Sequence, residues 1–300
     1  MKIEMDYNLA NRTVYVFLAG HSLVWNISIF VNNMYSVRGG IKTKSIHLII
    51  IHLAFTNIIM LVSKGVPKII PAFGVRNFLD DTGCKIVAYL ERVARGLSIC
   101  TSALLTVVQA AAISPRHSRW RRLKPRASWQ VFPLLLFFWI LNSLIDINLV
   151  YSITNISMNI SQLRKSDTYC FYLRGRQKMK WLFLTVMVLR DAVFQGFMGG
   201  ASGYMVFLLH KHHQRVLHLQ SCKLLYKTPP EIKAAQSVLL LMLCFLFFYW
   251  IDCVLALYIS FENHSMVINI REFLTIGYAI LSPFVLIHRK GHLANCRHAH

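Results

Sequence analysis

Residues 45–65 read SIHLIIIHLAFTNIIMLVSKG, a run in which Lys64 is the single formally charged side chain. About 20 mostly apolar residues are enough for an α-helix to cross the hydrocarbon core of a bilayer. The composition of the whole chain agrees, because 55% of its 300 residues are hydrophobic, 15% are charged and the mean hydropathy is +0.47. Soluble domains usually carry about 25% charged residues. The sequence therefore favours a membrane protein with several spans over a soluble or disordered chain.

Six further apolar runs have the length of a membrane span. In chain order, the predicted spans cover residues 13–34, 45–65, 84–113, 130–151, 179–209, 234–259 and 267–288. The first is the weakest prediction, because His21 and three asparagines interrupt it. No internal repeat or linker divides the chain. We therefore predict a single all-α domain over residues 1–300, built as a bundle of seven transmembrane helices.

The distribution of basic residues predicts how this bundle faces the membrane. A net charge of +21 would suit a nucleic-acid-binding protein if the charge formed one patch. With the N-terminus outside, however, 17 Lys and Arg residues fall in inner segments and 10 in outer segments. An excess of Lys and Arg marks cytoplasmic loops. The charge therefore predicts an outside N-terminus, an inside C-terminus and no nucleic-acid partner.

Glycosylation sequons and cysteines agree with that orientation. Four sequons fall in segments placed outside, at Asn11, Asn155, Asn159 and Asn263. Of the seven cysteines, Cys84 and Cys170 are the two that would face the oxidising side of the membrane. A disulfide between them would tie the second outer loop to the third predicted span. The alternative is a pair of free thiols.

Six short sequences carry a family resemblance. They are KGVP at 64–67, AFGVRNFLDD at 72–81, RVARGLSICT at 92–101, ISPR at 113–116, YWID at 249–252 and LSPFVLIH at 281–288. They closely resemble the vomeronasal type 1 receptors, a family of pheromone-type G-protein-coupled receptors. The resemblance covers nearly the whole chain from the second predicted span onward. It implies a chemosensory receptor of the plasma membrane that binds a small-molecule or peptide chemosignal and activates an inhibitory, Gi/Go-type G protein.

Other functions find less support in the sequence. A type 2 bitter taste receptor would share the fold, but the Cys84–Cys170 pair and the run at 92–96 argue against it. A small transporter or channel would be favoured by paired broken helices in two related halves, which the sequence does not contain. Hydrolase, zinc-protease and P-loop motifs are absent from the sequence. We therefore predict no enzymatic activity, no cofactor and no metal site.

Charged residues within the predicted spans gather toward the outer side of the bundle. Ionisable side chains are costly inside a bilayer, so each is a candidate functional residue. The ligand-binding candidates are Glu91, Arg92, Arg95, Arg190, Asp191, Asp252 and Arg271. The competing interpretation is structural, because Glu91 and Arg95 are spaced i, i+4 and ion pairs between helices would neutralise the others. Arg92 and Arg95 share a helix face that would suit a carboxylate or a sulfate.

Three further features concern the inner side and the helix contacts. The G-protein-facing candidates are Arg116, Arg119, Arg121 and Arg122, in a basic segment that could instead rest on anionic membrane lipid. Pro283 would kink the seventh predicted span and is the candidate hinge. Glycines at 196, 199, 200 and 203 form two overlapping G-x-x-x-G spacings, which predict close packing against another helix.

Overall fold

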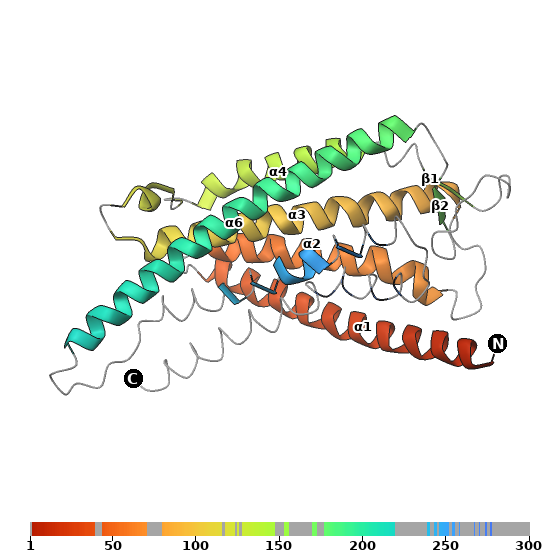
Figure 1. The fold of residues 1–300 in the computed structure, drawn as a ribbon, viewed down its shortest axis with the longest axis horizontal. Coiled ribbons are helices and arrows are strands. Elements are labelled where there is room, and N and C mark those ends of the chain that lie inside the picture. The colour runs from red at the N-terminus through yellow and green to blue at the C-terminus, as the bar shows by residue number, and fades with distance from the viewer. Residues whose placement is uncertain are drawn as a thin grey trace.

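The computed structural model shows an elongated bundle of helices (Figure 1). It describes residues 2–39, 44–70, 80–115, 118–123, 125, 128–147, 153–155, 170–172 and 177–219, together with positions 239, 240, 243, 244, 246–251, 254, 255, 258, 267, 270, 274 and 277. The α-helices with described bounds are α1 (Lys2–Arg38), α2 (Lys44–Ile69), α3 (Asp81–Ile113), α4 (Val131–Asp146) and α6 (Gln177–Leu219), and the described positions beyond 219 are also helical. Two short 3-10 helices, η2 (Arg119–Leu123) and η3 (Ser128–Gln130), precede α4, and two strands, β1 (Ile153–Asn155) and β2 (Cys170–Tyr172), lie between α4 and α6.

Successive helices run in opposite directions along the bundle. The strands lie at the end where α1 begins, which we call the N-terminal end, and η2 lies at the opposite end, which we call the η2 end (Figure 1). As a result α3 and α6 run in the same direction, from the N-terminal end to the η2 end. The central element is α3, which contacts α2, α4 and α6. It is therefore the helix against which three others pack.

Four described helical segments are long and apolar enough to cross a membrane. They are Thr13–Arg38, Ser45–Pro67, Thr82–Ile113 and Thr185–Lys211, and Val131–Asp146 is a shorter apolar helix. These helices correspond to the first five predicted spans. The sixth and seventh predicted spans lie mostly outside the described residues, although Phe248 and Gly277 approach closely: a Cβ at Gly277 would lie 2.6 Å from Phe248 Cε1. The seven-span arrangement stays a prediction.

Three helix boundaries differ by five residues or more from those expected from the apolar runs. The first helix begins at Lys2 instead of 13, the fourth ends at Asp146 instead of 151, and α6 continues to Leu219 instead of 209. At 43 residues, α6 is about 64 Å long, roughly twice the thickness of the hydrocarbon core. A helix needs no apolar surroundings once it has left the membrane, so α6 continues through polar residues beyond the η2 end (Figure 1).

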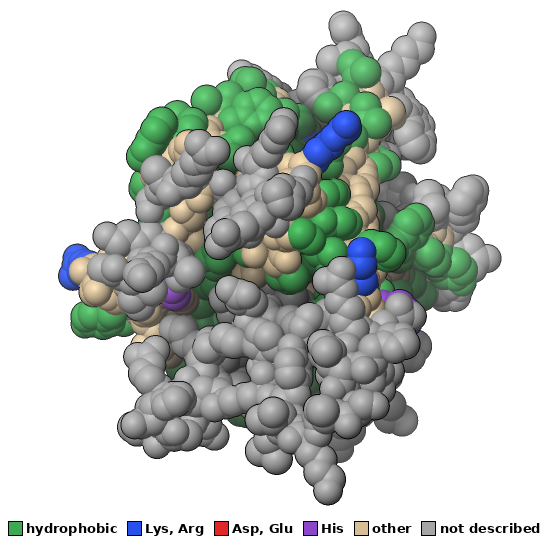
Figure 2. All heavy atoms as spheres, turned by 90° about the vertical axis from the view of Figure 1, so that its left-hand side faces the viewer, with side chains coloured by type: hydrophobic (Ala, Val, Ile, Leu, Met, Phe, Trp, Pro, Cys, Tyr) green, Lys and Arg blue, Asp and Glu red, His purple; other side chains and the backbone are tan. Residues whose placement is uncertain are grey.

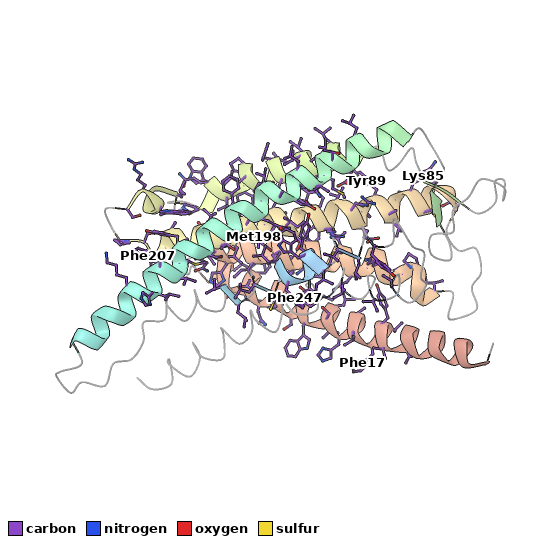
Figure 3. All side chains as sticks on the ribbon, viewed as in Figure 1. Phe17, Lys85, Tyr89, Met198, Phe207 and Phe247 are labelled. Atoms are coloured by element: carbon purple, nitrogen blue, oxygen red, sulfur yellow. The ribbon has the colours of Figure 1, made fainter. Side chains whose placement is uncertain are left out.

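The bundle buries both apolar and polar side chains and directs apolar side chains outward. Met198 lies fully buried against the central helices, whereas Phe17 is 70% and Phe207 is 58% exposed and both point away from them (Figure 3). The interior also holds Asn57 and Gln109, which are 1% and 3% exposed. An apolar surface and a partly polar interior suit a helix bundle whose solvent is lipid.

Candidate functional site

A buried charged cluster joins α4 to α6 in the half of the bundle nearer the N-terminal end. Arg190 donates from Nε to Asp191 Oδ1 at 2.8 Å and from Nη1 to Asn142 Oδ1 at 2.8 Å. The same Nη1 lies 3.4 Å from Asp146 Oδ2 of α4. The Arg190, Asp146 and Asp191 side chains are each 5% exposed. Ions buried to this extent need hydrogen-bonded counter-ions. Each charged residue of the cluster therefore depends on the others to remain buried.

Arg92 of α3 brings the formal charge of this cluster to zero. Its guanidinium interacts electrostatically with Asp146. Its Nη1 also lies 3.2 Å from Met187 Sδ of α6, although a thioether sulfur is a weak acceptor. With Arg92 and Arg190 set against Asp146 and Asp191, two cations balance two anions across three helices.

Gly96 makes the close approach of α3 to this cluster possible. A Cβ at Gly96 would collide with Asn142 Oδ1 and would lie 2.7 Å from Arg190 Nη1. The Asn142 amide is itself held in place, because its Nδ2 donates to Phe138 O at 2.7 Å and lies 3.6 Å from Cys100 Sγ. The absence of a side chain at position 96 is therefore a packing requirement.

A second charged group, on α2 and α3, is only half-buried. Lys64 Nζ lies 3.3 Å from Glu91 Oε1, with side chains 13% and 31% exposed. Arg95, one turn further along α3, is also half-buried. The i, i+4 spacing had suggested a pair between Glu91 and Arg95, but the structure gives Glu91 a partner on the neighbouring helix.

Neutral hydrogen bonds connect the rest of the interior. Trp139 Nε1 of α4 donates to His52 Nε2 of α2 at 3.0 Å. His52 therefore carries its proton on Nδ1 and donates it to Thr101 Oγ1 of α3 at 2.9 Å. Asn57 of α2 donates to Asn26 Oδ1 of α1 at 3.3 Å. These bonds fix the positions of α1, α2, α3 and α4 relative to one another.

A polar and aromatic cluster lies at the η2 end, where α3 stops. Pro115 ends the helix because the residue before a proline disfavours helical backbone angles, and Ser114 accordingly has φ −60° and ψ 141°. The Tyr204 hydroxyl of α6 lies 3.2 Å from Ser114 Oγ and 3.0 Å from Ser118 Oγ. The Tyr204 ring stacks on Trp120, with centroids 4.9 Å apart and 12° between the planes.

Comparison with known proteins identifies relatives of this chain. The sequence profile of the vomeronasal organ pheromone receptor family matches residues 15–299. The chain belongs to this receptor family. It is 35% identical to the vomeronasal type-1 receptor 4 of Homo sapiens over 252 residues, which is 83% of each chain. It is 34% identical to the human vomeronasal type-1 receptor 3, over 82% of this chain and 80% of that one. It is 30% identical to the olfactory receptor class A-like protein 1 of Danio rerio, over 82% and 78%.

This vomeronasal-family chain is therefore a membrane receptor, and its predicted site residues can be placed in part. Glu91, Arg92, Arg95, Arg190 and Asp191 all lie in the half nearer the N-terminal end, and their roles in ligand binding stay predictions. The predicted ligand, glycosylation, G-protein-facing and hinge residues that lie outside the described residues are Asp252, Arg271, Asn159, Asn263, Arg116 and Pro283. The backbone alone is described at Asn11, Asn155, Cys170, Arg121 and Arg122.

Cys84 of the receptor is disulfide-bonded and fully buried. It lies at the beginning of α3, and α3 contacts β1. In the antiparallel β1–β2 pair, Asn155 lies opposite Cys170. The Cys170 side chain is outside the described residues, so its pairing with Cys84 stays a prediction that this neighbourhood favours.

The η2 end of the receptor is basic in the part of the chain that the structure describes. Figure 2 views that end and shows Lys and Arg side chains but no Asp or Glu side chain among those coloured by type. Arg119 in η2 and Lys211 in α6 are exposed. The acidic residues with described side chains all lie in the other half: Asp80, Glu91, Asp146 and Asp191.

The glycine spacings of α6 do not mark a contact between described helices. A Cβ added at any of the four glycines, 196, 199, 200 and 203, would have no described atom of another helix within 4 Å. The expected close packing of these glycines is therefore not found within the described bundle.

Several important residues were missed by the sequence analysis. Lys64 carried a usable signal, because a lysine inside an apolar run is costly unless it has a partner. Gly96, Asn142 and Tyr204 carried none, because their importance depends on which helices lie beside them. Among the described residues, no group of three His, Cys, Asp or Glu side chains is placed to hold a metal ion.

Proposed function

We propose that this chain is a chemosensory receptor of the plasma membrane that binds a small-molecule or peptide chemosignal and activates a Gi/Go-type heterotrimeric G protein. In this proposal a single domain over residues 1–300 crosses the membrane seven times, with the N-terminus outside and the C-terminus inside. The observation that carries the proposal is membership of the vomeronasal pheromone receptor family over nearly the whole chain. The basic η2 end supports the orientation, because cytoplasmic loops carry the excess of Lys and Arg.

The ligand would bind among the half-buried charges nearer the N-terminal end. Lys64, Glu91 and Arg95 are only half-buried, whereas Arg190 and Asp191 are 5% exposed and already hydrogen-bonded to each other. A ligand reaches exposed groups more readily than groups that would first lose buried partners. Because Arg95 is half-buried and a guanidinium can hold a carboxylate or a sulfate through two hydrogen bonds, we propose that Arg95 contacts a negatively charged group of the ligand.

Replacing Arg95 by alanine is expected to weaken activation by anionic ligands about tenfold to a hundredfold, because a charge-assisted hydrogen bond is lost. The measurement is a dose–response curve in transfected cells, corrected for surface expression. Lys85→Gln, which removes a positive charge near the beginning of the same helix, is the control and should shift the curve by less than about threefold. An unchanged response of the Arg95 variant to every anionic ligand would remove Arg95 from the proposed site.

The G protein would bind at the opposite, basic end. Arg119 is exposed there, and the proposal includes Arg116, Arg121 and Arg122 of the same segment. The experiment is G-protein activation in transfected cells with confirmed surface display, using pooled volatile and steroid-sulfate fractions. A response that is absent from mock-transfected cells and is blocked by a toxin specific for inhibitory G proteins is expected. A response that survives the toxin would contradict the Gi/Go assignment.

Two alternatives make different predictions in the same cells. A bitter taste-like receptor would respond to bitter compounds and not to the chemosignal fractions. A transporter or channel would produce substrate flux or ionic current that needs no G protein. Loss of the response in cells lacking G-protein α subunits of the inhibitory class would argue against a transporter or channel.

A further inference from the structure

We infer that Tyr204 is a positioning residue that holds the basic segment after α3 in the arrangement needed for G-protein activation. This inference rests on the proposed function, because it assigns a role within G-protein coupling. It goes beyond that function by naming a residue on α6 that acts through the segment carrying Arg119. The contacts of Tyr204 at the η2 end of the bundle carry it.

The first step is the turn that brings the segment back toward α6. After Pro115 ends α3, the Ser118 backbone N–H donates to Pro115 O at 3.0 Å, which closes a tight turn. The Trp120 backbone N–H then donates to Ser118 Oγ at 3.3 Å. Ser118 and Trp120 are thereby held on the side of the chain that faces α6.

The second step is the hydrogen bonding of the Tyr204 hydroxyl. Ser114 has one hydroxyl hydrogen, and two acceptors lie within its reach: Ala110 O at 2.8 Å and the Tyr204 oxygen at 3.2 Å. The Tyr204 hydroxyl also lies 3.0 Å from Ser118 Oγ. A single hydroxyl on α6 thus joins the last turn of α3 to the turn that follows it.

The third step is the aromatic contact, through which the Tyr204 ring, in addition to its hydroxyl, holds the segment after α3. The Tyr204 ring stacks on the Trp120 ring. Both rings pack against a small buried cluster of Ala110, Ala201 and Met205. Offset stacking of aromatic rings adds to the stability that the buried area provides. The hydroxyl fixes the backbone turn, and the ring fixes the first residues of η2.

The consequence for function follows from where these contacts lie. Tyr204 holds Trp120, and Trp120 is next in sequence to Arg119. Arg119 is exposed and is one of the residues proposed to face the G protein. From Tyr204, α6 continues as an uninterrupted helix to Leu219. A displacement of α6 would therefore move Tyr204 and, through it, the basic segment.

The test is Tyr204→Phe in the full-length receptor, purified in nanodiscs of phosphatidylcholine and phosphatidylserine. The variant keeps the ring on Trp120 and loses the hydroxyl, so the fold should survive. Amide hydrogen exchange at residues 114–123 is expected to accelerate about two- to tenfold, the range that one hydrogen bond supports. The rate of nucleotide exchange on purified Go, measured without added ligand, is expected to fall about three- to tenfold.

Two sets of variants distinguish a positioning role from a general loss of stability. Tyr35→Phe makes the same chemical change at a residue that is 68% exposed on α1, and should alter neither measurement. Ser114→Ala with Ser118→Ala should have at least the effect of Tyr204→Phe, because it also removes the bond from the Trp120 N–H to Ser118 Oγ. Adding Tyr204→Phe to that pair should cause no further change, because residues that act as a unit are not additive.

The two measurements separate the inference from the function on which it rests. Unchanged hydrogen exchange at 114–123 in Tyr204→Phe would overturn the inference, whatever the receptor activates. Faster hydrogen exchange with an unchanged nucleotide-exchange rate would show a structural contact without a role in coupling, and would also overturn it. A wild-type receptor that activates neither Gi nor Go, with or without the chemosignal fractions, would contradict the proposed function and, with it, the coupling role of Tyr204.

Discussion

Replacing Arg190 by methionine is expected to reduce the free energy of unfolding by about 3–5 kcal/mol, the cost of removing one partner from a buried ion pair. Methionine fills a similar volume but leaves Asp146 and Asp191 without the guanidinium that both now contact. The measurement is thermal unfolding of the purified receptor in nanodiscs, where a fall of roughly 10 °C in the midpoint is expected. The fraction of receptor at the cell surface should fall with it.

A matched control and a rescue make this prediction specific. Lys211→Met removes the same charge from an exposed position of the same helix, so its unfolding midpoint should stay within about 2 °C of wild type. Adding Asp191→Asn to Arg190→Met should recover much of the loss, because Arg92 and Asp146 then remain as one cation and one anion. A double variant no more stable than Arg190→Met would show that the charge balance is not what the cluster contributes.

Replacing Gly96 by alanine is expected to destabilise the receptor by about 3 kcal/mol, although alanine is the better helix former. The added Cβ would occupy space that Asn142 Oδ1 and the Arg190 guanidinium fill, so either α3 moves away or the cluster breaks. The measurement is again the midpoint of thermal unfolding. Loss of the Arg190 contacts should also make the Gly96 and Arg190 variants non-additive.

Gly200→Ala is the matched control for this substitution. No described atom lies within 4 Å of the Cβ it would add, and the position is exposed on α6. Alanine there is expected to leave stability unchanged or to raise it by up to about 1 kcal/mol. If both glycine variants behaved alike, the tight contact at Gly96 would not be a determinant of stability.

The sequence predicted the helices of this receptor better than it predicted their contacts. The length of an apolar run reports a membrane span directly, and α2 accordingly lies within a few residues of the predicted 45–65. The end of α6 could not be predicted in that way, because a helix that leaves the membrane can continue through polar residues. The full seven-span prediction depends on residues beyond 219, most of which lie outside the described chain.

The charged residues could likewise be predicted from the sequence, whereas their partners could not. The cost of an ion in a bilayer made Arg190 and Glu91 stand out from the sequence alone. Their partners depend on the register between helices, which no spacing within one helix contains. Glu91 therefore pairs with Lys64 of α2 and not simply with a neighbour on α3. Tyr204 could not be identified from the sequence, because its role requires the turn after Pro115 to return to α6.

The most direct test of the central claim is nucleotide exchange on purified G proteins by this receptor in nanodiscs, with thermal unfolding as the check that it is folded. The chemosignal fractions that activate transfected cells serve as the ligand source. The account predicts that they accelerate exchange on Gi or Go and not on a stimulatory G protein, and that Arg95→Ala reduces the effect. Folded receptor that accelerates exchange on neither class, or only on the stimulatory one, would contradict the account.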